Sequence, residues 1–509
     1  MTDAPPPPGD DPAPRRLGRG VALAIGAVFL LFIVGLAGYA LAGGSDDDDG
    51  AAAEPTAAPN TTTTTTEAPD PEADGQPDPP AHSVGDPYAP DSGATGYDAT
   101  HYDIAFRYDP EAGTIDGVTT MTAVADVDLD QFSVDLLALD VSDVKVDGEP
   151  AEFDVDGRDV RIQPAAPIAE GEEFESEIAY VGVPEPVISA GFPTGWLTTD
   201  DGGAYVIGEP DGAATWFPSN DHPSDKATVD LEVTVPRGWT VAANGDFAGR
   251  ERGGGDVTWT WQEDDPIATY LVTVAIDHFR MVEEETGSGL PLVSFYPEAD
   301  ADRLEGDFAD ADDMIEAFEE VFGPYPFDEY GAIVVPVDTG LALETQTRST
   351  FGIDVAGIEQ FRSHELAHQW FGDSLTPTRW SDIWLSEGFA SYAEMLWFDA
   401  SNPAYDIDVD AENRRDSIVG VDEEPILDPG VDRWFAEAVY QRGGLTLHAL
   451  RKTVGEENFF TILQRWTAEH EHQNVTTDEF IALAEEVSGQ DLDAFFTDWL
   501  EADEIPALP

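Results

Sequence analysis

The sequence contains no cysteine among its 509 residues. Disulfide bonds, thiolate metal ligands, cysteine nucleophiles and a lipid anchor on cysteine are therefore excluded. Histidine is also scarce, with 9 residues in the whole chain. Any metal ion that this chain binds must be held by histidine, aspartate or glutamate side chains.

Basic residues are few as well: 23 lysines and arginines stand against 104 aspartates and glutamates, for a formal net charge of −81. A chain with this charge repels phosphates, which excludes nucleic acid as a partner. Only Lys145, Lys226 and Lys452 are lysines. An acidic, lysine-poor surface suits concentrated salt, where the Debye length falls to about 3 Å. We therefore expect a halophilic protein; the alternative is an acidic protein from an ordinary source.

The N-terminal region carries one long apolar run. Residues 21–44 contain no charge, follow Arg15, Arg16 and Arg19, and precede an acidic stretch. A helix of that length spans a hydrocarbon core of about 30 Å. The charge asymmetry predicts a cytoplasmic tail at 1–20 and a single-pass anchor at 21–44, with the rest extracytoplasmic. The alternative is a signal peptide cleaved near Ala40-Leu41-Ala42, which would make the protein secreted.

The remaining chain divides by composition. Residues 45–96 are acidic and rich in threonine and proline, which predicts a solvated tether. Residues 97–280 alternate apolar and polar side chains, as at 228–235 and 257–261, which predicts an antiparallel β-sandwich. Residues 281–509 carry helical periodicity around a strand at 331–337, which predicts a mainly helical domain with a small sheet. Hydrophobic residues make up 41% of the chain, enough for folded cores.

One motif carries chemistry. The sequence His364-Glu365-Leu366-Ala367-His368 has the pattern H-E-x-x-H. On a helix, positions i and i+4 share one face, so both imidazoles can reach one metal ion. Glu365 lies about 100° around the helix from His364, where it can act on water at the metal without being a ligand.

A third ligand follows the motif. Glu387 stands in Trp-Leu-Ser-Glu-Gly-Phe-Ala, a segment with a helical apolar pattern. A loop after Gly372 lets this second helix fold back beside the first. Two imidazoles, one carboxylate and an open position form the catalytic type of zinc site. We expect one zinc ion per chain, and we expect the nearby Glu394 to support the site or to lie at the surface.

Further motifs give the sequence a family resemblance. It resembles the aminopeptidase N family of zinc metallopeptidases, the gluzincin aminopeptidases, from about residue 98 to 505. Besides the zinc motif, the resemblance rests on three segments, at 216–227, 322–327 and 439–443. It implies a β-domain followed by a thermolysin-like catalytic domain. It also implies a short form that lacks the large C-terminal helical domain of many relatives.

The resemblance implies roles for individual residues. His364, His368 and Glu387 would bind zinc, and Glu365 would take a proton from the attacking water and pass it to the leaving amine. Tyr440, in Tyr-Gln-Arg-Gly, would donate a hydrogen bond to the oxyanion; the family has lysine where this chain has an arginine.

The resemblance also implies how a substrate is held. The segment Gly-Leu-Ala-Leu-Glu-Thr, which includes Ala342, resembles the family's exopeptidase motif but departs from it at Leu341, Leu343 and Thr345. Glu344 in this segment would bind the free α-amino group of a peptide. Glu209, in Gly-Glu-Pro, falls where the family places a second residue that contacts the amine.

These features predict a zinc aminopeptidase that removes N-terminal residues from peptides with a free N-terminus, without an obligate protein partner. Two alternatives stay open. One is a zinc endopeptidase with the same site, against which Glu344 and Glu209 argue. The other is a catalytically inactive surface-binding protein of the same fold, against which Glu365 and Tyr440 argue.

Overall fold

The structure, a computed structural model, describes residues 81–509. The predicted cytoplasmic tail, the predicted anchor and residues 45–80 of the predicted tether lie outside the described residues. Part of residues 81–96, the end of that tether, is packed: Asp86, Tyr88 and Ala94 are buried. The backbone N–H of Trp380 donates to Asp86 at 3.0 Å, and the Tyr88 hydroxyl donates to Asp428 at 2.8 Å.

No helix within residues 81–509 is both long enough and apolar enough to cross a membrane. This finding contradicts the expected single-pass attachment to the cell membrane, and the expectation is corrected accordingly. The apolar segment at 21–44, on which it rested, lies outside the described residues.

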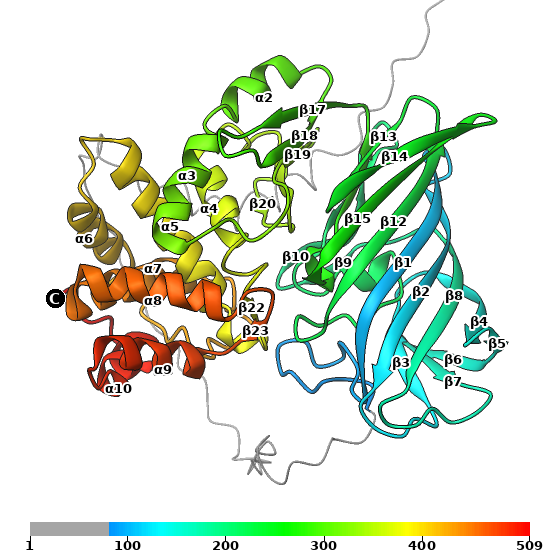
Figure 1. The fold of residues 1–509 in the computed structure, drawn as a ribbon, viewed down its shortest axis with the longest axis horizontal. Helices are drawn as coiled ribbons and strands as arrows, with labels where there is room; N and C mark the ends of the chain where they lie inside the picture. Colours follow the sequence, from blue (N-terminus) through cyan, green and yellow to red (C-terminus); the bar gives the residue numbers. More distant parts are fainter. Residues whose placement is uncertain (1–80) are drawn as a thin grey trace, which may run out of the picture. The chain divides into compact units, whose positions relative to one another are not determined.

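The first folded part is built on an eight-stranded sheet in the order β14-β15-β12-β1-β2-β8-β4-β5 (Figure 1). In β1, every second side chain from Tyr102 to Tyr108 is buried, because successive residues of a strand point to opposite faces. Neighbouring strands are antiparallel except for β1 and β12, which pair in parallel. The strands are β1 (Tyr97–Asp109), β2 (Thr114–Ala125), β4 (Asp140–Val146), β5 (Glu149–Pro150), β8 (Glu173–Gly182), β12 (Lys226–Pro236), β14 (Asp246–Gly253) and β15 (Asp256–Ala268).

A second sheet packs on the first. The ring of Phe106 in β1 meets Trp196 in β10 edge-on, with centroids 6.0 Å apart, so side chains of both sheets share one core. The predicted β-sandwich is confirmed, with one parallel pair within it. The second sheet has the order β13-β16-β11-β10-β9, and a smaller one has the order β3-β7-β6. Their strands are β3 (Phe132–Asp135), β6 (Glu152–Asp156), β7 (Asp159–Gln163), β9 (Val187–Ser189), β10 (Phe192–Thr198), β11 (Ala204–Ile207), β13 (Thr240–Ala243) and β16 (Val274–Asp277).

The second folded part is mainly helical, as predicted, around a five-stranded sheet in the order β17-β18-β19-β21-β20 (Figure 1). The strands of this sheet and of a short added pair are β17 (Phe279–Glu285), β18 (Pro291–Pro297), β19 (Ala332–Val335), β20 (Ala342–Leu343), β21 (Ser349–Gly352), β22 (Thr376–Pro377) and β23 (Asn474–Val475). The helices are α2 (Ala301–Asp307), α3 (Ala311–Phe322), α4 (Glu359–His368), α5 (Trp384–Ser401), α6 (Ile407–Ile418), α7 (Glu437–Val454), α8 (Glu456–Glu469), α9 (Thr477–Ser488) and α10 (Asp493–Phe496).

Helices α5 and α7 cross at a pair of glycines. A Cβ atom added to Gly388 would lie 2.8 Å from the Cα atom of Gly443, and one added to Gly443 would lie 2.6 Å from the Cα atom of Gly388. Such distances are far inside van der Waals contact, so only glycine fits at either position. The close crossing brings Glu387, next to Gly388, and Tyr440, three residues before Gly443, toward the same region.

A half-buried lysine joins the two folded parts. Lys226, at the start of β12, donates to the backbone carbonyls of Asp373 at 2.7 Å and Ser374 at 3.0 Å. Both carbonyls belong to the loop that follows α4. A β-strand of the first part therefore fixes the loop that connects the two helices of the H-E-x-x-H and Glu387 segments.

Candidate metal centre and substrate site

Helix α4 carries the two histidines of the motif on one face. The ring centroids of His364 and His368 lie 4.7 Å apart, as expected for residues one turn apart on a helix. The last turn of α4 is followed by Gly372, whose φ of 128° lies in a region that favours glycine. The chain turns there and leads into the loop before α5.

Helix α5 brings a carboxylate to the histidine pair. One oxygen of Glu387, Oε2, lies 3.2 Å from Nε2 of His364 and 3.5 Å from Nε2 of His368. One potential ligand atom from each of these three residues lies within 4.8 Å of the others. Burial by itself would raise the pKa of Glu387, but the imidazoles of His368 and His364 lower it to about 2.

The Nδ1 atoms of both histidine rings have hydrogen-bond partners on the side away from Glu387. Nδ1 of His368 lies 2.9 Å from the carbonyl oxygen of Phe371, and Nδ1 of His364 lies 2.8 Å from Oε1 of Glu394. When Nδ1 donates in both rings, each Nε2 lone pair faces Glu387 and is free for a metal ion. Glu394 is itself fixed by Arg414, whose Nη2 donates to its other oxygen at 2.9 Å.

The three residues fit a zinc ion. Two neutral imidazoles and one ionised carboxylate form the ligand set of a catalytic zinc site, which keeps a further position for water or substrate. Orientation of each imidazole by a carbonyl or a carboxylate is also typical of metal-binding histidines. The fit rests on the convergence of donor atoms from two helices, although 18 residues separate His368 from Glu387 in the sequence.

Two further glutamates lie at this centre. Glu344 forms a compact group with Glu365 and His368, and Glu209 forms one with Glu344 and Glu387, each with potential ligand atoms within 4.8 Å. Glu209 is 5% exposed and Glu344 is 3% exposed. Oxygen Oε1 of each has no hydrogen-bond partner within residues 81–509.

The buried glutamate carboxylates of the site repel one another. Burial, followed by the charges of Glu344 and Glu387, raises the pKa of Glu209 well above its ordinary range. Burial also raises the pKa of Glu365, to about 8, although the two imidazoles lower it. Buried carboxylates of this density require cations, because unpaired charges are costly away from water. A metal dication and the ammonium group of a ligand would both meet that requirement.

The two glutamates come from different folded parts. Glu209 follows β11 in the first part, and Glu344 follows the edge strand β20 in the second. Ala342 lies on β20, half-buried, and pairs with Phe351 of β21 in antiparallel register. The edge position of β20 leaves one side of this strand without a strand partner in its sheet.

Tyr440 comes from the first turn of α7. Its ring lies over that of His364, with centroids 6.0 Å apart and planes at 28°. Burial, followed by the nearby charges of Glu387 and Glu209, raises the pKa of its hydroxyl well above the ordinary range. The hydroxyl therefore stays protonated and can donate a hydrogen bond.

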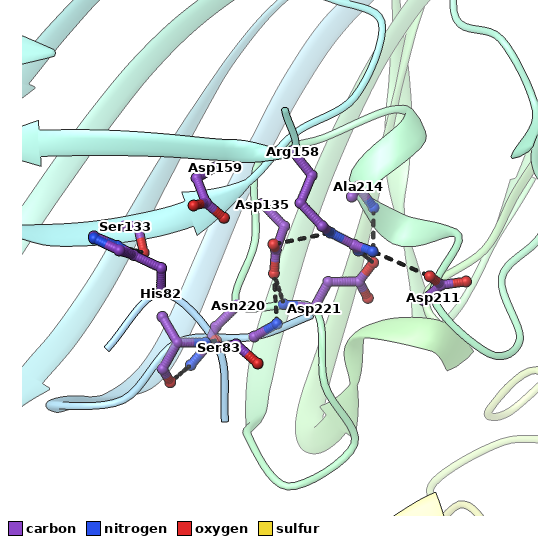
Figure 2. Close-up of polar contacts among 12 residues, drawn as sticks. His82, Ser83, Ser133, Asp135, Arg158, Asp159, Asp211, Ala214, Asn220 and Asp221 are labelled. Carbon is purple, nitrogen blue, oxygen red and sulfur yellow. Dashed lines mark hydrogen bonds and ion pairs between the residues drawn. The ribbon is translucent and has the colours of Figure 1, made fainter. Parts of the chain in front are cut away.

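The segment that contains Glu209 is braced by Arg158, whose contacts with aspartates are drawn in Figure 2. Arg158, in the turn between β6 and β7, lies among three carboxylates. Its Nη1 donates to Asp211 at 3.0 Å, its Nε to Asp135 at 3.0 Å, and its Nη2 to Asp221 at 3.1 Å. Asp211 is two residues from Glu209, so this network fixes the backbone that carries Glu209.

Sequence reasoning missed several of these residues. Asp373 is fully buried, and within the described residues both its carboxylate oxygens lack a hydrogen-bond partner. Its only sequence signal is its position, five residues after His368. The role of Arg158 left no local signal, because its three partners are far from it in sequence. Glu394 was not missed: the sequence predicts that it supports the site or lies at the surface, and Oε1 of Glu394 lies 2.8 Å from Nδ1 of His364.

Two family models match the chain. The Peptidase M1 N-terminal domain matches residues 98–271, and the Peptidase family M1 domain matches residues 308–499. Among curated proteins, aminopeptidase N of Streptomyces lividans is 27% identical over 448 residues, covering 81% of this chain and 51% of that protein. Aminopeptidase M1 of Arabidopsis thaliana is 27% identical over 325 residues, covering 59% of this chain and 37% of that protein. The chain thus spans about half the length, or less, of these two relatives.

Solved structures match over almost their whole length. The M1 zinc metallopeptidase of Deinococcus radiodurans has a TM-score of 0.77 and 31% identity, and the match covers 84% of this chain and 99% of that one. A mutant of that enzyme bound to a Tyr-Ser-Ala substrate has a TM-score of 0.76 and 30% identity, with the same coverage. From both domain matches and this coverage, the chain belongs to the M1 family of zinc metallopeptidases.

Proposed function

We propose that this protein is an aminopeptidase that hydrolyses the first peptide bond of substrates with a free N-terminus. The observation that carries the proposal is the pair of buried glutamates, Glu209 and Glu344, beside the histidine and carboxylate cluster. An α-ammonium group is the ligand that best offsets two buried carboxylates at this position. The Tyr-Ser-Ala substrate bound in a mutant of the Deinococcus radiodurans relative gives further support.

His364, His368 and Glu387 would hold the zinc ion. Zinc supplies electrophilic polarisation of the peptide carbonyl and activates water at neutral pH. Glu365 would act as the general base, taking the proton from the attacking water and passing it to the leaving amine. Burial raises the pKa of this carboxyl to about 8, and a nearby dication would bring it down toward the range useful for a base at neutral pH.

Tyr440 would stabilise the charge that develops on the substrate. Its protonated hydroxyl, held on the first turn of α7 over the ring of His364, is a donor that needs no reorganisation during the reaction. Glu344 and Glu209 would fix the ammonium group, while Ala342 on the edge strand β20 would line the substrate backbone. Holding the N-terminus at a fixed place sets which peptide bond lies over the metal, so each round of hydrolysis removes one N-terminal residue.

A direct test compares free and blocked amines. A panel of aminoacyl fluorogenic substrates and their N-acetyl counterparts is offered to the zinc-loaded protein, then to the chelated protein, and again after zinc is restored. We expect hydrolysis of the free amines alone, with loss on chelation and recovery with zinc. Comparable cleavage of acetylated peptides would instead indicate the endopeptidase alternative. Absence of any hydrolysis by protein with zinc bound would indicate the inactive binding protein.

A further inference from the structure

Three arginines stand apart from the other basic residues of the described chain. Within residues 81–509, every other lysine and arginine side chain bonds to a carboxylate or, for Lys226, Arg415 and Arg442, to backbone carbonyls. The guanidinium groups of Arg237, Arg250 and Arg252 have neither kind of bond in that range. The chain carries 104 acidic residues against 23 basic ones, so a carboxylate partner would be easy to supply.

These three arginines line one cavity. It has a volume of about 260 Å³, and its other walls include the side chains of Trp239 and Trp259. Arg237 and Trp239 come from the connection between β12 and β13, whereas Arg250, Arg252 and Trp259 come from β14 and β15. The guanidinium groups therefore approach the cavity from two separate segments of the chain. Figure 1 shows β14 at the edge of the large sheet.

Strand register explains why two of the arginines face the cavity. Arg250 pairs with Trp259 and Arg252 pairs with Val257 across β14 and β15. Residues paired in this way lie on the same face of a sheet. Trp259 and Val257 are buried, at 2% and 6% exposure, so the two arginines lie at the margin of the inner, apolar face. Glu251 lies between them in sequence and points to the opposite face.

No nearby carboxylate bonds to the guanidinium groups of Arg237, Arg250 and Arg252 within the described residues. The Asp256 carboxylate feels the charge of Arg237, but its two oxygens bond to Arg107 at 2.6 and 3.3 Å. The guanidinium of Arg250 lies 4.8 Å from the centre of the Trp259 ring, a cation–π contact that offers no negative charge. His278, which stacks on Trp239 with ring centroids 4.5 Å apart, brings no anionic group either.

An edge strand often carries charged residues because they block pairing with another chain. That explanation accounts for Arg250 and Arg252 on β14. It does not account for Arg237, which comes from another segment, or for the two indole walls of the same cavity. Three like charges gathered without counter-charges repel one another, and the acidic remainder of the molecule repels most anions from elsewhere on the surface.

We propose that this cavity is a binding site for a small oxyanion with at least two negative charges, a phosphate or polycarboxylate group. A guanidinium group donates two parallel hydrogen bonds to such oxyanions, which gives both strength and geometric selectivity. Three guanidinium groups on two sides of one cavity can surround a multiply charged group. The indole of Trp239 provides an apolar wall for the carbon skeleton or ring that carries the charges. The site is separate from the metal centre in its residues and in the segments that form it.

Titration calorimetry at constant ionic strength tests the proposal, with inorganic phosphate and tricarballylate as separate probes. We expect one saturable site per chain for at least one probe, and a rise in the thermal midpoint as that probe is added, because a ligand that binds only the folded state stabilises it. The relative response to the two probes distinguishes a phosphate site from a carboxylate site. Absence of saturable binding for both probes would overturn the proposal.

Two double variants make the test specific. In Arg250→Gln with Arg252→Gln, we expect binding to weaken at least about tenfold, because two charge-assisted contacts are lost. The matched control, Arg303→Gln with Arg465→Gln, removes the same charge from an exposed and a half-buried position, both of which bond to carboxylates, and it should bind like the wild type. The single variant Arg237→Gln, in a loop, serves if the strand variant does not fold. Equal binding by all variants would contradict the assignment.

Discussion

Single residues set the charge balance of the metal centre. Glu209, Glu344, Glu365 and Glu387 are all buried there, and two of them keep an oxygen without a partner among the described residues. As neutral zinc ligands, the two imidazoles would not offset that charge. We therefore propose that the centre receives two cations, a metal ion and an ammonium group, each bound by different residues.

Replacing Glu365 by glutamine should separate metal binding from turnover. Glu365 is not one of the three converging ligands, so Glu365→Gln should retain about one zinc per chain. Loss of the general base should reduce kcat by about a thousandfold. Metal content and steady-state kinetics measured on the same preparation give the result. A variant with unchanged kcat would remove Glu365 from the proposed mechanism.

The variant Glu394→Gln should have the opposite effect to Glu365→Gln, with weaker zinc binding but an intact general base. Glu394 bonds to Nδ1 of His364 and does not belong to the converging ligand group. Its substitution should weaken zinc affinity by about tenfold or more, while added zinc restores much of the activity. Zinc affinity measured by competition with a chelator distinguishes the two variants. If Glu394→Gln binds zinc as tightly as the wild type, Glu394 has no part in orienting His364.

Substitution of Glu344 should affect free amines selectively. Glu344→Ala removes a buried partner of the proposed ammonium site, and the loss of such a charge pair, worth about 3 kcal/mol, corresponds to roughly a hundredfold in kcat/KM. Glu344→Gln keeps the shape and removes only the charge, so it should show most of the same loss. Kinetics with aminoacyl substrates give the comparison. Unchanged kcat/KM in both variants would exclude Glu344 from amine binding.

How far the site could be predicted depends on the kind of signal each residue leaves. The spacing of His364 and His368 is a local helical signal and is readable from sequence alone. Glu209 and Ala342 have no such signal, and only the family resemblance singled them out. Asp373 and Arg158 were missed because their surroundings are created by contacts between segments far apart in the chain, which no local pattern encodes.

At the scale of elements, the crossing of α5 and α7 positions Glu387 and Tyr440, for which we propose roles in metal binding and catalysis. Gly388 and Gly443 allow the two backbones to approach more closely than any side chain would permit. Lys226 acts at a second joint, where β12 meets the loop after α4. Both joints connect elements that carry or follow metal-site residues, so the site depends on packing that lies outside it.

A methyl group at the helix crossing should therefore disturb the site. Gly443→Ala forces α5 and α7 apart, which shifts Tyr440 relative to the metal centre. We expect destabilisation by about 1–3 kcal/mol, as for overpacking of a core, together with a fall in kcat. Thermal unfolding and kinetics measure both effects. Gly455→Ala is a poor control because of its positive φ, whereas Gly306→Ala, with open space around it, should leave kcat unchanged.

Some helix and strand boundaries agree with the apolar pattern of the sequence, and others do not. The alternating segment at 228–235 lies within β12, and the hydroxyl of Thr476 accepts from the backbone N–H of Glu479 at the start of α9. The helical periodicity of the second part is interrupted between α2 and α3. The division falls at 308–310, just after Gly306, and glycine is a poor helix former.

At the scale of the whole molecule, the net charge of −81 opposes folding through self-repulsion. Salt screens that repulsion, with a Debye length of about 10 Å at 0.1 M and about 3 Å at 1 M. We expect the thermal midpoint to rise steeply as chloride increases over this range. A midpoint that stays flat down to about 0.05 M salt would contradict the halophilic interpretation, without bearing on the family assignment.

Buried acids should also make stability depend on pH. Burial, followed by the charge of Asp98, raises the pKa of Asp225 from 3.8 to about 8, and burial raises that of Glu263 from 4.5 to about 8. Because the folded state holds these protons more tightly, the stabilisation is fully present below about pH 4 and is lost as the pH rises toward 8.

Urea unfolding at 1 M salt, where general repulsion is screened, isolates this effect. The free energy of unfolding should be lower at pH 8 than at pH 5, and Asp225→Asn should reduce the difference. Glu111→Gln, at an exposed position, serves as the control. A free energy that rises from pH 5 to pH 8 would have the wrong sign and would contradict the proposed protonation of these acids.

The most direct measurement of the proposed activity is mass spectrometry of the products from one defined peptide of about ten residues. The zinc-loaded protein should produce a ladder in which residues disappear one at a time from the N-terminus, because we propose that Glu209 and Glu344 hold that end at the metal. The same peptide with an acetylated N-terminus should remain intact. Internal fragments at the earliest times, from both the free and the acetylated peptide, would contradict the proposal that this M1 metallopeptidase is an aminopeptidase.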